Sequence, residues 1–280
     1  MQNAQKVFEK RDTDLDSKKE YNVIRCDGAG CLDSVHDLIG EEPLMIRVED
    51  NPYSVIMRTP GDETFHAAGF CLSEGIVDNI NDFVTIGFCE DMDRNVVDVK
   101  LKPERRKKVS SLLERKGFIS QTSCGICGKV LIDEISQILT PTTNNAKIPI
   151  GKVYEAGGML PDIQHLYPIT RGSHAVMILN RDLDILSTSE DVGRHNAFDK
   201  AIGKLLMTRK LTEAFMGVLS SRISFEMIQK ANRAGIPFLL SGSRPTALAA
   251  DLGKSMNMTI ACLGDDSELI IFSGKERILR

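Results

Sequence analysis

Short apolar runs alternate with amphipathic segments through the second half of the chain. Three of these runs contain few polar positions, which is typical of strands buried on both faces of a sheet. The segments between them repeat apolar residues at helical spacing. The predicted strands lie at 175–179, 183–186, 214–219, 236–240 and 259–263, and the predicted helices at 197–206, 222–234 and 246–256. This pattern predicts an α/β domain over residues 146–280, in which a hairpin leads into a mainly parallel sheet.

The first half of the chain has a different pattern. Leu44, Ile46 and Val48 occupy every second position, which is typical of a strand with one buried face. Further elements are predicted at 21–25 (strand), 53–57 (strand, returning after a turn at 49–52), 62–75 (helix), 83–89 (strand) and 96–101 (strand). We therefore expect a smaller α+β domain over residues 21–145.

Composition narrows the class of protein. Hydrophobic residues make up 42% and charged residues 26% of the 280, which is typical of a soluble globular protein, and the polar residues 1–20 predict a mobile tail. No apolar run approaches the ~20 residues of a membrane span, and the N-terminus lacks the apolar core of a secretory signal. A net charge of −4 argues against nucleic acid as the main partner. The seven cysteines are irregularly spaced and odd in number, so we expect a reduced, cytoplasmic protein without a disulfide framework.

A pair of cysteines three residues apart, Cys124 and Cys127, is the most distinctive motif. It lies on a glycine-rich loop between a basic predicted helix at 103–116 and an apolar-periodic predicted helix at 130–139. Such a loop leaves the sulfurs accessible, whereas a structural cysteine usually lies within an apolar run.

The cysteine pair admits three interpretations. It is half of a tetrahedral zinc site, which Cys26 and Cys31 would complete. It is a thioredoxin-like dithiol, although that motif is expected after a strand and here follows a helix. Or it provides a nucleophilic thiolate that carries a transferable group, with Lys129 and the amides of the next helix favouring the anion. The motif alone does not choose among them.

Polar residues concentrate in the turns of the predicted α/β domain. These turns lie at 170–174, 189–196, 220–222 and 241–246. At least three of them follow a strand and open a helix, where backbone amides bind phosphate. Arg194, Arg222 and Arg244 are candidates to face one anion. In the simpler alternative Asp191 and Ser243 cap helices while the arginines pair with surface acids, but three such turns in one domain favour a phosphate-bearing ligand.

A set of short motifs extends along most of the chain. They are Glu42-Pro43-Leu44, Met57-Arg58-Thr59-Pro60, Gly69-Phe70, Glu74-Gly75-Ile76, Cys124-Gly125-Ile126-Cys127-Gly128, Glu190-Asp191-Val192-Gly193-Arg194-His195-Asn196 with Asp199-Lys200, Arg222-Ile223-Ser224-Phe225-Glu226, and Ser243 with Pro245-Thr246. In combination they resemble the FdhD family of formate dehydrogenase accessory sulfurtransferases, from residue 42 to about residue 275.

The resemblance implies a fold, a reaction and partners. The second domain is expected to be a three-layer α/β/α domain similar to cytidine deaminase but without zinc, which agrees with the absence of an H-x-E signature and with Ser123 in place of the usual proline. The implied reaction moves persulfide sulfur from a cysteine desulfurase to molybdenum bis(molybdopterin guanine dinucleotide), before that cofactor enters formate dehydrogenase. The protein would be a homodimeric sulfur carrier without a catalytic metal of its own.

The resemblance also assigns residues. Cys124 is the expected persulfide carrier, and Cys127 would assist release by attacking the bridging sulfur. The guanine-dinucleotide site maps onto Leu263, Gly264, Asp265, Asp266, Ser267 and Glu268, to which we add Arg194 and His195 from the preceding turns. We expect the turns at 170–174, 191–196 and 243–246 to line one cavity with residues 263–268.

The chain departs from the family pattern at Leu263, Asp265 and Glu268. Acids near a phosphorylated ligand weaken its binding, unless a carboxylate such as Asp265 accepts hydrogen bonds from guanine.

Two alternatives to sulfur transfer stay open. One is a zinc-stabilised nucleotide-binding module that uses Cys26 and Cys31 together with Cys124 and Cys127. The other is a nucleotide-modifying enzyme on a deaminase-like scaffold, which is disfavoured because no metal-activated water or general base is evident.

Overall fold

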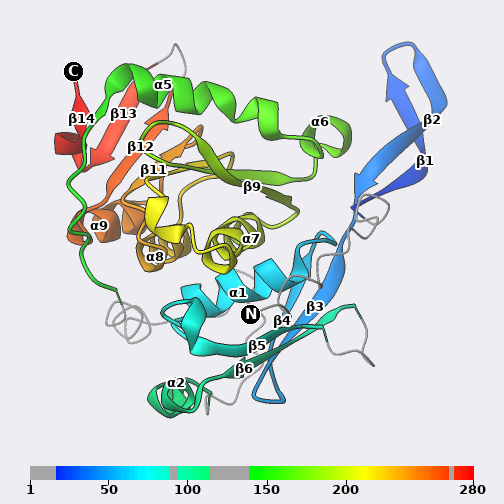
Figure 1. Ribbon diagram of the computed structural model, residues 1–280. Coiled ribbons are helices and arrows are strands. Elements are labelled where there is room, and N and C mark those ends of the chain that lie inside the picture. The colour runs from blue at the N-terminus through cyan, green and yellow to red at the C-terminus, as the bar shows by residue number, and fades with distance from the viewer. Residues whose placement is uncertain (1–16, 89–93, 114–138, 265–267) are drawn as a thin grey trace.

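A mixed six-stranded sheet forms the centre of the larger part of the molecule (Figure 1). The computed structural model describes residues 17–88, 94–113, 139–264 and 268–280. The strands run in the order β13 (Leu269–Ser273), β12 (Thr259–Leu263), β11 (Phe238–Ser241), β10 (Met216–Leu219), β8 (His174–Leu179) and β9 (Ile185–Asp191). The strands β10, β11 and β12 are parallel, and the β8–β9 hairpin and β13 add antiparallel strands at the two edges. This arrangement confirms the predicted hairpin and the three predicted parallel strands.

Helices cover both faces of this sheet. On one face lies α5 (Ile150–Met159), and on the other lie α7 (Arg194–Met207), α8 (Phe225–Arg233) and α9 (Ala247–Ser255) (Figure 1). Along β8 the side chains alternate between the two sides. Met177 belongs to the apolar cluster beneath α5, whereas Val176 and Ile178 belong to the larger cluster beneath α7. The larger part of the chain is therefore a layered α/β structure.

The first half of the chain forms a second sheet and one buried helix. The sheet runs in the order β4 (Asn51–Arg58), β3 (Glu42–Val48), β6 (Val96–Leu101) and β5 (Phe83–Phe88), and α1 (Glu63–Ser73) lies between it and α7 (Figure 1). The inner residues of this sheet belong to the same apolar cluster as α7 and α8. One continuous core thus joins the two predicted domains, and the whole is a mixed α/β chain with several sheets.

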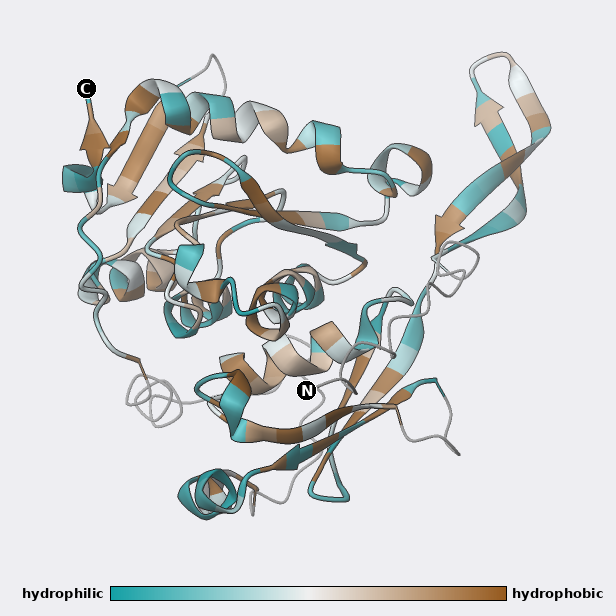
Figure 2. Cartoon of the chain, viewed as in Figure 1, coloured by the Kyte–Doolittle hydropathy of each residue, from teal (hydrophilic) through white to brown (hydrophobic). Residues whose placement is uncertain are grey.

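Hydropathy follows this layering. Figure 2 shows apolar residues along the strands of both sheets and hydrophilic residues on the outer helix α2 (Pro103–Lys108). Short elements complete the described chain: α3 (Ser110–Leu113), α6 (Tyr167–Thr170), β7 (Ile148–Pro149), β14 (Ile278–Leu279), and 3-10 turns at Ile80–Asp82, Pro161–Ile163, Leu211–Glu213 and Lys275–Arg277. No helix among the described residues is long and apolar enough to cross a membrane.

A two-stranded arm projects from the body and was not predicted as a unit. Its strands are β1 (Lys18–Asp27) and β2 (Gly30–Ile39), which pair only with each other in the described sheets (Figure 1). The predicted strand at 21–25 lies within β1, which begins at Lys18 and so includes the end of the segment predicted to be a tail. The second strand was missed because its exposed, mixed sequence lacks a buried face.

One other predicted helix differs from expectation, and another lies almost wholly outside the described residues. The basic segment predicted as one helix over 103–116 divides into α2 and α3, with Val109 between them, and its last residues lie outside the described chain. The predicted helix at 130–139 lies outside it too, except for Leu139. The helix α5 was not predicted, because three glycines lower its intrinsic helix propensity.

Candidate functional site

Five polar turns meet along the edge of the six-stranded sheet that is formed by the carboxyl ends of its parallel strands. The parallel strands β10, β11 and β12 end there at Leu219, Ser241 and Leu263. Since β8 runs antiparallel to β10 and β9 antiparallel to β8, this edge also holds the start of β8 at His174 and the end of β9 at Asp191. The turns predicted to gather at the end of the sheet therefore do so.

Hydrogen bonds connect neighbouring turns along this edge. The backbone N–H of Ala175 donates to Ser220 Oγ at 2.8 Å, which links the start of β8 to the end of β10. Ser241 Oγ donates to the carbonyl oxygen of Ser221 at 2.6 Å, which links β11 to β10. The N–H of Gly264 donates to the carbonyl oxygen of Glu268 at 2.7 Å and closes the connection to β13. The turns form one continuous polar rim.

Arginine and histidine side chains lie on this rim. Arg194 is the first residue of α7, is half-buried, and its Nε has no hydrogen-bond partner in the described part of the chain. Burial, followed by the charge of the neighbouring Arg194 and His195, lowers the pKa of His174. Arg222 and Arg244 are exposed on the next two turns. Cationic groups from three turns are thus available at the edge where a phosphorylated ligand was expected.

His195 has a carboxylate neighbour that the sequence did not reveal. Its Nε2 lies 3.7 Å from Glu226 Oε2, which also accepts a hydrogen bond of 2.7 Å from Ser224 Oγ. The interaction with His195, opposed by partial burial and aided by Ser224, lowers the pKa of Glu226 to about 2. Glu226 is therefore ionised at neutral pH. The only signal for it in the sequence was its place in the Arg222–Glu226 motif.

The simpler interpretation, in which Asp191 and Ser243 cap helices, is wrong for both residues. Thr246, rather than Ser243, caps α9 by accepting a hydrogen bond from the N–H of Ala249 at 3.2 Å. Asp191 does not occupy the N-cap of α7, which is Gly193. Its carboxylate instead accepts a hydrogen bond from the N–H of Gly193 at 2.9 Å and turns inward.

A buried ion pair anchors the inward side of the same turn. Asp191 is 0% and Lys200 2% exposed, and Lys200 Nζ lies 2.6 Å from Asp191 Oδ2. Both residues also bond to Thr59, because the N–H of Thr59 donates to Asp191 at 3.1 Å and Lys200 Nζ donates to the carbonyl oxygen of Thr59 at 2.7 Å. Asn196 Nδ2 donates to Asp191 Oδ1 and to the carbonyl oxygen of Met57, both at 2.8 Å. These contacts bind the first half of the chain to the turn that carries Arg194.

A second buried ion pair uses Asp199, the residue before Lys200 on α7. Lys230 Nζ lies 2.7 Å from Asp199 Oδ2, and Ser73 Oγ donates to Asp199 Oδ1 at 2.8 Å. His66, on the neighbouring helix α1, is fully buried. Burial first, and then the charges of Lys200, Lys230 and Arg58, hold its pKa well below the usual value, so the imidazole is neutral. We call the residues Thr59, Ser73, Asp191, Asn196, Asp199, Lys200 and Lys230 the seam.

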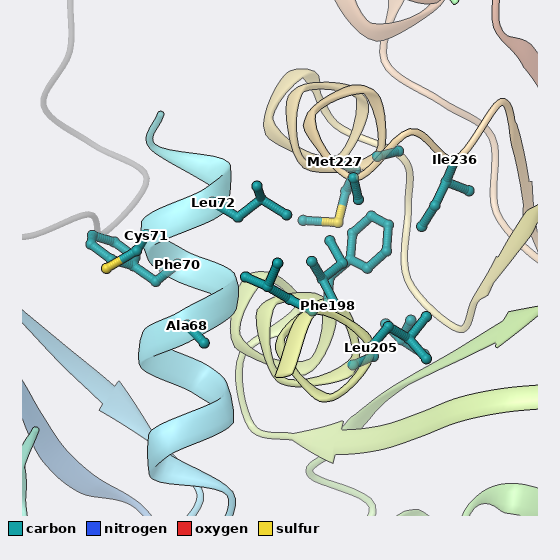
Figure 3. Packing of buried hydrophobic residues seen from close by; sticks show 14 of the residues in the cluster. Ala68, Phe70, Cys71, Leu72, Phe198, Leu205, Met227 and Ile236 are labelled. Atoms are coloured by element: carbon teal, nitrogen blue, oxygen red, sulfur yellow. The ribbon is translucent and has the colours of Figure 1, made fainter. Parts of the chain in front are cut away.

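Glycines bring α1 and α7 close enough for the seam to form. A Cβ atom on Gly69 would lie 1.9 Å from the carbonyl oxygen of Asp199, and one on Gly203 would lie 1.8 Å from that of Phe65. Around this crossing, Leu72, Phe198 and Met227 meet between α1, α7 and α8 (Figure 3). The seam is therefore fixed by backbone-to-backbone packing as well as by its ion pairs.

The residues predicted for sulfur and cofactor chemistry are only partly described. Cys124 and Cys127 lie outside the described residues, as do Asp265, Asp266 and Ser267. The polar rim includes Leu263, Gly264 and Glu268, which lie on either side of residues 265–267. Arg194 and His195 lie on the same rim, at the start of α7.

The predicted shared cavity stays a prediction. Cavities of about 320 Å³ and about 230 Å³ lie elsewhere, the first between the end of α9 and β13, and the second beside β4 and α3.

The zinc alternative that combined four cysteines is wrong for this state of the chain. Cys26 and Cys31 are joined by a disulfide bond at the end of the arm, so their sulfurs are not free thiolates. The expectation of a wholly reduced chain is corrected by the same bond. Register explains it, because Cys26 and Cys31 are directly opposed in the β1–β2 pairing. Within the described residues no group of three or more histidine, cysteine or acidic side chains is arranged to hold a metal ion.

The fold and rim define a class of protein: a mixed α/β chain whose motif segments meet at a buried seam and an open polar edge. Comparison with known proteins then gives the family. The model of the FdhD/NarQ family matches residues 39–279, and the chain belongs to this family.

Curated relatives cover nearly the whole chain. A protein of Streptomyces coelicolor, named sulfur carrier protein FdhD, is 35% identical over 268 residues, which are 91% of this chain and 94% of the relative. Proteins of the same name from Anaeromyxobacter dehalogenans strain 2CP-C and Sulfurisphaera tokodaii are 33% and 31% identical, over 92% and 85% of this chain and 93% and 90% of their own.

A solved structure shares the fold. The crystal structure of a formate dehydrogenase accessory protein from Desulfotalea psychrophila aligns with a TM-score of 0.74 over 94% of this chain and 99% of its own, at 21% identity. At that identity the likeness concerns the fold alone. The resemblance drawn from the motifs is confirmed at the level of the family.

Proposed function

We propose that this protein is a sulfurtransferase that carries sulfur as a persulfide on Cys124. It accepts the sulfur from a cysteine desulfurase and delivers it to molybdenum bis(molybdopterin guanine dinucleotide), the cofactor that formate dehydrogenase requires. The observation that carries the proposal is membership of a family whose curated relatives are named sulfur carriers, together with an intact Cys124–Cys127 loop in this sequence. The formate dehydrogenase link draws support from the name of the structural neighbour.

The first transfer step balances without a redox partner, whereas release by Cys127 leaves a disulfide that a thiol reductant must reduce before the next cycle. A thiolate of Cys124 attacks the outer sulfur of the desulfurase persulfide, a new S–S bond forms on Cys124, and the desulfurase cysteine leaves as a thiolate. In the second step the outer sulfur passes to the client. Attack by Cys127 on the Cys124 sulfur would release that outer sulfur as hydrosulfide and leave a disulfide between the two cysteines.

The polar rim supplies the proposed place for the client. Arg194 and His195 would contact phosphate oxygens, since both lie at the start of α7, where helix amides also favour anions. Leu263, Gly264 and Glu268, with the intervening acids, would contact guanine. The zinc-free deaminase-like form of the second domain, a cytoplasmic location and a homodimer belong to the same proposal.

Mass spectrometry of the loop tests the carrier role. After incubation with a cysteine desulfurase and cysteine, the peptide containing Cys124 and Cys127 should gain about 32 Da for each added sulfur. Cys124→Ala should abolish the adduct and the maturation of formate dehydrogenase. The matched control is Cys262→Ala, because Cys262 is a buried cysteine in β12 and should affect neither. An adduct confined to Cys71 or Cys89 would refute the assignment.

A further inference from the structure

The β1–β2 arm carries a disulfide that the proposed function does not use. Cys26 and Cys31 are both exposed, and they lie next to the turn at the far end of the arm (Figure 1). The main contact of the arm with the body is at its opposite end, where β2 meets α6 and Ile39 packs against Gly172. The sulfur atoms are therefore far along the arm from the part that the body supports.

The disulfide contributes little to the stability of the body of the protein, so its effect is expected within the arm. It joins two residues that the hairpin already holds opposite each other, and it closes a loop across a sequence separation of only five. Disulfides that close short loops constrain the unfolded chain least. The turn also has its own support, because the N–H of Ala29 donates to Asp27 Oδ1 at 2.8 Å.

The environment of the bond leaves it open to attack. Two positions along the strands, the pair that lies on the same face as the disulfide is Ile24 and Asp33, and both residues are exposed. The free cysteines of the described chain contrast with it, since Cys71 and Cys262 are buried and burial raises the pKa of both thiols. Exposed disulfides are the ones that exchange with thiols, whereas structural disulfides resist reduction.

We propose that Cys26 and Cys31 form a second thiol site, a disulfide that exchanges with dithiols while the protein stays folded. A thiolate of the dithiol attacks one sulfur, which breaks the Cys26–Cys31 bond and forms a mixed disulfide. The second thiol of the reagent then resolves the mixed disulfide, so that the protein gains two thiols and the reagent leaves as its own cyclic disulfide. A small-molecule disulfide reverses the reaction and leaves as two thiols.

Exchange at this site changes the order of the arm. A two-stranded ribbon with no third strand is marginally stable in water. The bond pins the end that has no support from the body, so opening it should loosen the pairing from the turn toward the middle of the arm. Ile24, Leu32 and Val35, which are 71%, 76% and 59% exposed, lie in that part.

Differential alkylation of the folded wild-type protein tests the exchange. The chain is treated with dithiothreitol without denaturant, free thiols are blocked with N-ethylmaleimide, and the peptides are quantified by mass spectrometry. The Cys26–Cys31 peptide should become alkylated while Cys71 and Cys262 stay unmodified, and oxidised glutathione should restore the bond. A bond that opens only when denaturant is added would overturn the proposal.

Hydrogen exchange tests the consequence for the arm. Reduction should speed amide exchange across residues 22–35 by at least about tenfold and leave the central sheet unchanged. A Cys26→Ser/Cys31→Ser variant should match the reduced wild type, whereas Cys262→Ser should match the oxidised one. Unchanged exchange in the reduced arm would overturn the coupling. A Cys124→Ser/Cys127→Ser variant should retain both effects, so failure of the sulfur-carrier proposal and failure of this one give different results.

Discussion

One short stretch of the chain, residues 190–200, contains two regions with opposite properties. Asp191, Asn196 and Lys200 point inward and are almost fully buried in the seam, where every one of them has hydrogen-bonding partners from the first half of the chain. Arg194 and His195, between them in sequence, lie on the polar rim and are only half-buried. A single motif thus serves both stability and the proposed ligand site.

The difference shows that residues of one motif can be expected to affect either the stability of the protein or the binding of a ligand. Glu190, the first residue of the motif, accepts hydrogen bonds from the N–H groups of residues 165–167 and from Ser173, which orders the segment before β8. Such residues place the turn and are expected to affect stability. The residues of the motif that lie on the rim, Arg194 and His195, are the ones expected to affect ligand binding.

The largest expected effect comes from breaking the buried ion pair of the seam. Lys200→Met leaves Asp191 without its cation at a site that water does not reach, and removing one partner of such a pair costs about 3–5 kcal/mol. The free energy of unfolding, measured by urea denaturation, should fall by that amount. Arg222→Ala, an exposed change on the rim, serves as the control and should stay within about 0.5 kcal/mol of wild type. A loss below about 1 kcal/mol for Lys200→Met would contradict the importance given to the seam.

The next effect concerns the helix crossing that brings the seam together. Gly203→Ala would place a methyl group against the backbone of Phe65, so α1 and α7 must separate, at a cost of about 1–3 kcal/mol. The matched control is Gly158→Ala in α5, where a Cβ meets nothing within 4 Å. That change should stabilise the protein by about 0.5–1 kcal/mol, because alanine favours a helix. Changes of the same sign in both variants would show that packing does not decide the result.

Sequence patterns predicted the elements well where burial is one-sided or complete. Apolar runs such as residues 236–240 identified the parallel strands, and the repeat from Ala197 to Leu206 identified α7. The helix α5 was missed because its three glycines lower the helix propensity, and one of them, Gly157, is favoured by packing, since a Cβ there would lie 2.1 Å from Leu263 Cδ1. Spacing along one helix or strand carries no information about such contacts.

The candidate site was predicted in its location but not in its supports. The order of strands and turns placed the polar residues at one edge of the sheet, as the structure has them. The bond between Thr59 and Asp191 joins residues 132 positions apart, and the proximity of His195 to Glu226 depends on how α7 and α8 pack. Pairings of this kind arise from tertiary structure, so a single sequence gives no periodic signal for them.

A third prediction concerns ligand binding at the rim. Arg194→Ala should weaken the binding of GDP, a stand-in for half of the proposed client, by roughly 1–3 kcal/mol because a charge-assisted hydrogen bond is lost. Calorimetry at low salt measures this, and the free energy of unfolding should change little. The control is Arg209→Ala near the other end of α7, where the guanidinium bonds to Asn81. Equal GDP affinity in the wild type and the Arg194 variant would remove Arg194 from the proposed site.

The smallest expected effect is a pH dependence at the rim. Because the folded state holds the pKa of Glu226 at about 2, below its ordinary value of 4.5, its contribution to stability is fully present above pH 4.5. The contribution is lost as the pH falls from 4.5 toward 2, where the folded state must also take up the proton. Its size should stay below about 1 kcal/mol, since the side chain is 52% exposed and water screens the interaction with His195. Urea denaturation of wild type and Glu226→Gln should therefore give a difference in unfolding free energy at pH 6 that disappears near pH 2. A difference of the same size at both pH values would contradict this prediction, because it would mean that Glu226 contributes to stability through packing and not through its charge.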